Sequence, residues 1–382
     1  MEGRRAWGLL RDAAATPVPW AALLALLLVA WHEPWRDEAE HWLLVRDATG
    51  LAGFFDALSY VGTPALWHLL MAPFAKLGLP FLSARLLHAA IAVSIVALVW
   101  TKAPFSRWQR WLLCFGYYFA YEYSAITRSY VLFALLLLTA AAVDKQRHER
   151  PVLYASIVAL LANTTVHGLV VAVVLAGSYG IEVLRGLRSG AWTRGVTAGL
   201  AVVMGGFFLA VLPLRAPADI DPVVGAWHFW DHLWTPAQSA LAAFVPIPSL
   251  QPVFWNSLLL GSISGTSKIL LALFLYVATG WTLRRSPRAV GIYVAAVLFL
   301  QAIFVAKYYY HNHHAGLVFL TFVFALWISR AEPPAVRTPP RAFLRNVDRL
   351  AAGTVGVLLV LQVAAAGIAI AGDARGEFSA AP

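Results

Sequence analysis

The stretch PVPWAALLALLLVAWHEPWRDEAEHWLLVRDA, residues 17–48, contains the pattern that decides the fold. An apolar run comes first, and a strongly charged segment follows it at once. This order is typical of a helix that crosses a membrane, which takes roughly 20 mainly apolar residues, and then emerges into a polar loop. Pro34 favours a break at the end of that helix. The segment 37–47 is expected to form a short helix, capped by Asp37 with Glu40 in the capping-box position.

The composition of the whole chain agrees with a membrane protein. Of its 382 residues, 60% are hydrophobic and 13% are charged, whereas soluble domains have about 45–50% and about 25%. These values exclude an ordinary soluble enzyme and a disordered protein. The single cysteine, Cys114, excludes an intramolecular disulfide and a cysteine-based zinc site. We expect it to be a small core residue.

Apolar runs separated by charged clusters recur along the chain. We therefore predict an all-α polytopic membrane protein, a single domain over 1–382, with about 11 transmembrane helices (range about 9–12). The predicted spans are 17–32, 84–101, 111–124, 127–143, 151–164, 167–184, 195–213, 267–283, 289–306, 315–329 and 351–371. Prolines, a lysine and a glycine interrupt the run 64–82, which is expected to be an interfacial helix instead.

The distribution of basic residues gives the expected orientation. With the N-terminus in the cytoplasm, the predicted inner segments hold 20 of the 29 Lys and Arg residues, as the positive-inside rule requires. The net charge of +10 is thus a topology signal, and no nucleic-acid partner is expected. No small-residue cleavage site follows the first span, so we expect it to remain as an uncleaved anchor in the plasma (inner) membrane.

Two predicted outer loops, 32–83 and 214–266, are longer than the others. The first carries the adjacent carboxylates Asp37 and Glu38 directly after the first span. Carboxylates that repel each other and lose hydration have raised pKa values, which suits a general base that takes a proton from a hydroxyl. A capped, solvated acidic turn is the alternative. The second loop contains WHFWDHLW at 227–234, and we expect it to fold over a site or lie on the membrane.

The first 140 residues or so contain several short motifs in a defined order. The Asp37-Glu38 pair follows a short first span. After it come GTPALWHLL (62–70), SARLLHAAIA (83–92) and YEYSAITRSYVLFALLLLTA (121–140). This arrangement resembles the GT-C membrane glycosyltransferases, and most closely the group of the protein O-mannosyltransferases and the lipid A aminoarabinose transferases.

The resemblance implies an inverting transfer of a sugar from a polyprenyl-phosphate carrier to a glycan, lipid or protein acceptor on the outer face. It also implies that Asp37 is the catalytic base and that Glu38 orients the acceptor or the base. Family members usually have a basic residue and then Pro-Pro-Leu where this chain has Gly62-Thr63-Pro64-Ala65-Leu66. Either another cation replaces that basic residue, or the donor differs.

Several cationic and polar residues at the predicted outer membrane surface are candidates for holding the donor phosphate. Charged groups at membrane depth usually face a cavity or a partner, and Arg offers a bidentate fork to phosphate. The candidates are Arg85, Arg128, Lys307, His311, His313 and His314. For the arginines, snorkelling to the headgroups or pairing with Glu122 is the alternative. For the histidines, the alternatives are a polar interfacial turn and a divalent metal site.

The acceptor pocket is expected to include His167, Trp230, Asp231 and His232, although an aromatic belt at the interface would also explain the tryptophan-rich stretch. No metal or other cofactor is expected, because consecutive histidines rarely point at one ion. Nucleotide-binding motifs such as G-x-x-x-x-G-K-[ST] are absent from the sequence. A transporter or flippase of a lipid-linked or small polar substrate is the main rival function, and a non-catalytic subunit with the same fold is another.

Overall fold

The computed structural model describes residues 15–187, 192–215, 217–219, 234–249, 255–307, 311–332 and 342–375. In these ranges every regular element is helical. The first half contains α2 (Pro17–Trp31), α3 (Arg36–Asp47), α4 (Gly50–Val61), α5 (Leu66–Lys76), α6 (Leu82–Lys102), α7 (Arg107–Cys114), the π-helical turn η1 (Tyr118–Glu122), α8 (Tyr123–Ala125), α9 (Tyr130–Val143), η2 (Asp144–Gln146), α10 (Pro151–Ala162) and α11 (Val166–Arg185). The second half contains α12 (Arg194–Val211), η4 (Leu212–Leu214), α14 (Thr235–Phe244), η5 (Leu259–Ser262), α15 (Gly265–Leu283), α16 (Pro287–Ala306), α17 (Asn312–Ala331) and α18 (Ala342–Asp373).

Seven helices in the described ranges are long and apolar enough to cross a membrane, which supports the prediction of a multi-pass membrane protein. They are α6, α11, α12 with η4, α15, α16, α17 and α18. The pair α2 and α3, bent by 84°, would be an eighth if it is one span. The other predicted spans, 111–124, 127–143 and 151–164, coincide with shorter helices. The count of about eleven therefore stays a prediction. The same holds for the interfacial position of 64–82, which forms α5 and a turn into α6.

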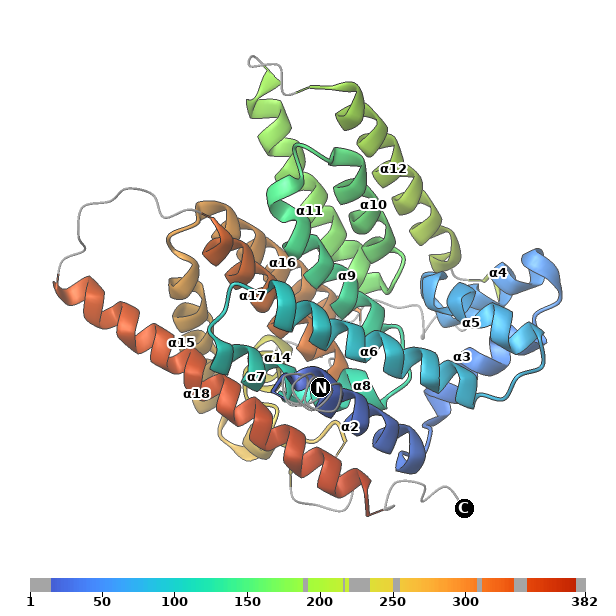
Figure 1. Cartoon of the computed structure of the whole chain (residues 1–382), viewed down its shortest axis with the longest axis horizontal. Coiled ribbons are helices and arrows are strands. Elements are labelled where there is room, and N and C mark those ends of the chain that lie inside the picture. The colour runs from blue at the N-terminus through green and yellow to red at the C-terminus, as the bar shows by residue number, and fades with distance from the viewer. Residues whose placement is uncertain are drawn as a thin grey trace, which may run out of the picture.

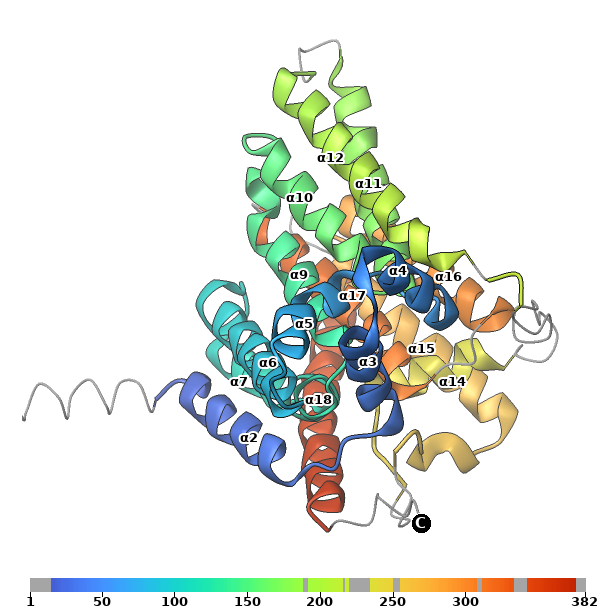
Figure 2. The same cartoon turned by 90° about the vertical axis from the view of Figure 1, so that its right-hand side faces the viewer.

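Helix α17 lies at the centre of the bundle. Every residue from Asn312 to Ile328 is buried, and the helix packs against α9, α14 and α16. A helix that is apolar on all sides is expected to be enclosed in this way. Helices α10, α11 and α12 extend to one side, whereas α15 and α18 lie on another (Figure 1). The short helices α3, α4 and α5 gather at one edge of the bundle (Figure 1), and this edge faces the viewer in Figure 2.

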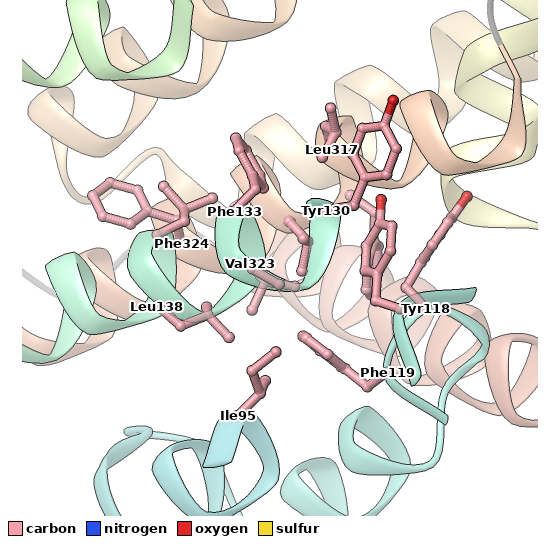
Figure 3. Close-up of a cluster of buried hydrophobic side chains, with 14 of the residues drawn as sticks. Ile95, Tyr118, Phe119, Tyr130, Phe133, Leu138, Leu317, Val323 and Phe324 are labelled. Carbon is pink, nitrogen blue, oxygen red and sulfur yellow. The ribbon is translucent and has the colours of Figure 1, made fainter. Parts of the chain in front are cut away.

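Aromatic side chains from η1 and α8 pack onto α17. The rings of Tyr118 and Phe319 stack with their centroids 5.7 Å apart, and the Tyr123 hydroxyl donates to the His313 carbonyl at 2.7 Å. Figure 3 shows Tyr118 and Tyr130 among the apolar side chains of this cluster. Gly316 makes the close approach possible, because a Cβ at that position would overlap the Tyr118 ring and the Tyr123 hydroxyl. Cys114 is buried, so its expected place in the core is confirmed.

The predicted outer loop 214–266 contains a buried helix, α14. A buried helix was not expected there, because the loop was predicted to fold over a site or to lie on the membrane. The carbonyls of Ala242 and Ala243, at its C-terminal end, accept hydrogen bonds from the Tyr118 hydroxyl at 2.8 Å and from Gln362 Nε2 at 2.9 Å. Non-helical backbone inside a membrane protein is tolerated only where protein groups satisfy it. Residues 235–249 therefore enter the bundle instead of lying over its surface.

The replacement Gly316→Ala tests the packing of η1 and α8 on α17. The added methyl group would displace two buried aromatic side chains, and overpacking of this kind costs roughly 1–3 kcal/mol. We expect a lower midpoint of thermal unfolding in detergent micelles. Gly291→Ala in α16 is the matched control, because nothing lies within 4 Å of its added Cβ. Equal unfolding midpoints for the two variants would show that the close packing at Gly316 does not limit the stability of the protein.

Candidate functional site

A cavity of about 740 Å³ opens between α3, the end of α4, and the N-terminal ends of α9, α11 and α17. Its volume is within the range of about 300–1,000 Å³ that is usual for ligand sites. Residues predicted to act in the site that line this cavity are Asp37, Arg128, His167, Lys307, His311, His313 and His314. Segments far apart in the sequence thus bring most of the predicted site residues together.

Helix α3 presents Asp37 to the cavity. The helix begins at Arg36, and the N-cap residue is Trp35 rather than Asp37. The capping carboxylate is Glu38, whose Oε1 accepts from the Trp35 N–H at 2.8 Å. The predicted cap by Asp37, with Glu40 as its capping-box partner, is therefore wrong. Because Asp37 is not used as the cap, its carboxylate remains 41% exposed at the cavity.

Glu38 lies beneath the cavity with its side chain fully buried. Besides the Trp35 N–H, its oxygens accept from the Thr127 N–H at 2.6 Å and contact His32 Nε2 at 3.1 Å. The other ring nitrogen of His32 lies 2.9 Å from the Asp373 carboxylate at the end of α18. A side chain enclosed in this way does not line the cavity and cannot contact an acceptor there.

The segment between α8 and α9 places Arg128 opposite Asp37. Arg128 Nη1 lies 3.5 Å from Asp37 Oδ2 and 3.4 Å from His313 Nε2, and the guanidinium lies over the Tyr130 ring. Arg128 pairs with Asp37 rather than with Glu122, which was the predicted alternative. Glu122 instead accepts a hydrogen bond from the Tyr117 hydroxyl at 2.7 Å.

Histidines from α11 and α17 form one wall of the cavity. The His313 and His314 rings have their centroids 4.3 Å apart, and the His314 and His167 rings 4.6 Å apart. His314 Nε2 lies 2.9 Å from the Tyr130 hydroxyl. Burial and the nearby charge of Arg128 lower the pKa of His311, so its imidazole is held neutral. In the described part of the chain, no group of three His, Cys, Asp or Glu side chains is arranged to hold a metal ion.

Two groups of predicted residues are not part of this cavity. Arg85 Nη2 donates to the His32 carbonyl at 2.7 Å and lies 3.4 Å from the Leu28 carbonyl, where it caps the C-terminal end of α2. Arg85 does not line the cavity, because the backbone at the end of α2 occupies its guanidinium. Trp230, Asp231 and His232 lie outside the described residues.

The structure adds residues that the sequence reasoning missed. His41 lines the cavity one helical turn after Asp37, with its Nδ1 2.9 Å from His68 Nε2. Residues four positions apart lie on the same face of a helix, so the spacing from Asp37 could have indicated that His41 faces the cavity. Asn256 also lines the cavity, and its side-chain oxygen accepts from the Asn312 N–H at 3.2 Å, which ties its segment to the start of α17. Nothing in the sequence indicated that Asp373 would meet His32.

The cavity brings cationic, carboxylate and imidazole side chains together. Its cations are Arg36, Arg128 and Lys307, whereas Glu33 and Asp37 are the carboxylates among the described lining residues. Neutral imidazoles can donate or accept hydrogen bonds according to their tautomer. No family model, curated protein or solved structure matches this chain.

Proposed function

We propose that this protein transfers a sugar from a polyprenyl-phosphate donor to a hydroxyl acceptor in the cavity, with inversion. One observation carries the proposal: the half-exposed carboxylate of Asp37 faces a cavity that is also lined by Arg128, Lys307 and a wall of histidines. This combination would supply a proton acceptor and, close to it, cationic groups able to stabilise a phosphate. The sequence resemblance to GT-C glycosyltransferases supports the same reaction.

In the proposed reaction the acceptor hydroxyl attacks the anomeric carbon of the sugar and loses its proton to Asp37. The new bond joins the acceptor oxygen to that carbon, and the bond from that carbon to the phosphate oxygen breaks. The prenyl phosphate leaves with the bonding electron pair. Cations aimed at a leaving group lower the barrier because its negative charge develops in the transition state. Arg128 and Lys307 have this role in the proposal.

Asp37→Asn tests the base. The amide keeps the size of the side chain but cannot accept a proton at neutral pH, so the rate of transfer should fall on the order of 10²–10⁴-fold. The measurement is transfer of radiolabelled sugar from a prenyl-phosphate donor in membranes. Glu40→Gln is the matched control, because Glu40 is exposed on the same helix and does not line this cavity. Near wild-type transfer by Asp37→Asn would refute the role, as would transport of the intact donor without transfer.

Arg128→Gln and Lys307→Gln test the donor phosphate site. Each change removes a charge-assisted hydrogen bond worth roughly 1.5–3 kcal/mol, so donor affinity should fall about tenfold or more. Binding can be followed by isothermal titration of the purified protein with prenyl phosphate. Arg215→Gln is the control, because this exposed arginine lies outside the cavity lining. Unchanged affinity in both cavity variants would place the phosphate elsewhere.

The proposal places Asp37 on the outer side of the plasma membrane with the N-terminus in the cytoplasm. Single cysteines at Asp47 and Glu149, both exposed, can test this after Cys114→Ala. A membrane-impermeant maleimide should label position 47 in intact cells and leave position 149 unlabelled until the membrane is opened. Labelling of position 149 in intact cells would show that the orientation is the reverse of the proposed one.

A further inference from the structure

Three side chains from distant parts of the chain form a continuous buried chain of hydrogen bonds below the cavity. Asp373 is the last residue of α18, His32 follows α2, and Glu38 lies in the first turn of α3. The distances are 2.9 Å from Asp373 to His32 Nδ1 and 3.1 Å from His32 Nε2 to Glu38. All three side chains are almost completely excluded from solvent. Both views place the C-terminal end of α18 beside the end of α2 (Figures 1 and 2).

We propose that Asp373 and His32 are positioning residues of the site, and that the chain Asp373–His32–Glu38 is a pH-sensitive latch that holds α3 in place. We call these three residues the latch. The expected effects on sugar transfer rest on the proposed function. The effect of the latch on α3 does not, because it depends only on the contacts of these three side chains. Its effect on the cavity follows from what Glu38 holds.

Glu38 fixes both sides of the pair formed by Asp37 and Arg128. One oxygen of Glu38 accepts a hydrogen bond from the Trp35 N–H and so fixes the start of α3. Asp37 directly precedes Glu38 in this first turn. The other oxygen accepts from the Thr127 N–H at 2.6 Å, and Arg128 is the next residue. A shift of Glu38 would therefore move the base and the guanidinium relative to each other.

The latch needs a protonated imidazole. An imidazolium donates from both ring nitrogens, whereas a neutral imidazole has a single N–H and can satisfy one of the two carboxylates. The other carboxylate would then be buried without its donor, and a buried charge without a partner is strongly destabilising. Loss of the His32 proton should thus release either the end of α18 or Glu38.

The surroundings of His32 determine where that proton is lost. Burial alone would lower the pKa of His32, but the hydrogen bonds and charges of Asp373 and Glu38 outweigh it and raise the pKa to about 9. Within the described residues, the other titratable groups that interact with the latch are Arg85 and His88 from α6 and Tyr121 and Glu122 from η1. Because the pKa is raised from 6.5, the stabilisation is complete below that value and is lost as the pH rises through about 9.

Hydrogen exchange of the α3 backbone amides, residues 36–47, in the full-length protein in nanodiscs tests the latch without a substrate. In the wild type, exchange should rise in one step as the pH passes about 9, after correction for the intrinsic rate. Asp373→Asn removes one carboxylate charge, so the step should move down by roughly one to two pH units. Asp373→Glu, which keeps the charge, should return the step toward the wild-type position.

Asp348→Asn is the matched control, because Asp348 lies in α18 but pairs with Arg284, away from the cavity. Its exchange profile for α3 should equal that of the wild type. His32→Gln cannot titrate, and its profile should have no step in this range. The latch is refuted if wild-type α3 shows no step, or if Asp373→Asn and the wild type have the same profile.

Two readouts separate the latch from the proposed reaction. Asp37→Asn should abolish transfer and leave the exchange step where it is. Asp373→Asn should retain transfer near pH 6.5 and lose it at a lower pH than the wild type does. If transfer is absent in the wild type but the exchange step moves as expected, the proposed reaction fails and the latch stands.

Discussion

The burial of one carboxylate, Glu38, determines the arrangement of the cavity. A charge enclosed by packed helices is stable only when hydrogen bonds and an opposite charge replace its water. The Trp35 and Thr127 N–H groups and the His32 ring supply that replacement. Helices α2 and α3 and the segment before α9 must therefore meet at Glu38, and the cavity forms where they meet.

Adjacent carboxylates have opposite roles because successive positions on a helix point about 100° apart. Glu38 points into the protein and is enclosed, whereas Asp37 faces the cavity and remains half-exposed. Glu38 is thus a structural residue and Asp37 is the candidate for reaction, and the two carboxylates do not share a proton. Arg128 lies beside Asp37 and balances the negative charge of its carboxylate in the cavity.

Much of the fold could be predicted from the sequence, because apolar runs and charge clusters follow directly from the cost of placing polar groups in lipid. The positions of the long helices and the grouping of Arg128, Lys307 and the α17 histidines near Asp37 agree with that reasoning. Helix α14 could not be recognised, because its burial depends on Tyr118 and Gln362, which are far from it in the sequence. For the same reason, the role of Arg85 as a helix cap was not visible.

The contact of Asp373 with His32 shows what such distant contacts contribute. Helix α18 carries no side chain that lines the cavity among the described residues, yet its last residue satisfies the ring that holds Glu38. His32 lies between the two carboxylates and, when it is protonated, donates a hydrogen bond to each of them. Because both carboxylates have a donor only while His32 is protonated, the proposed latch couples the end of α18 to the base of the cavity through a single site of protonation.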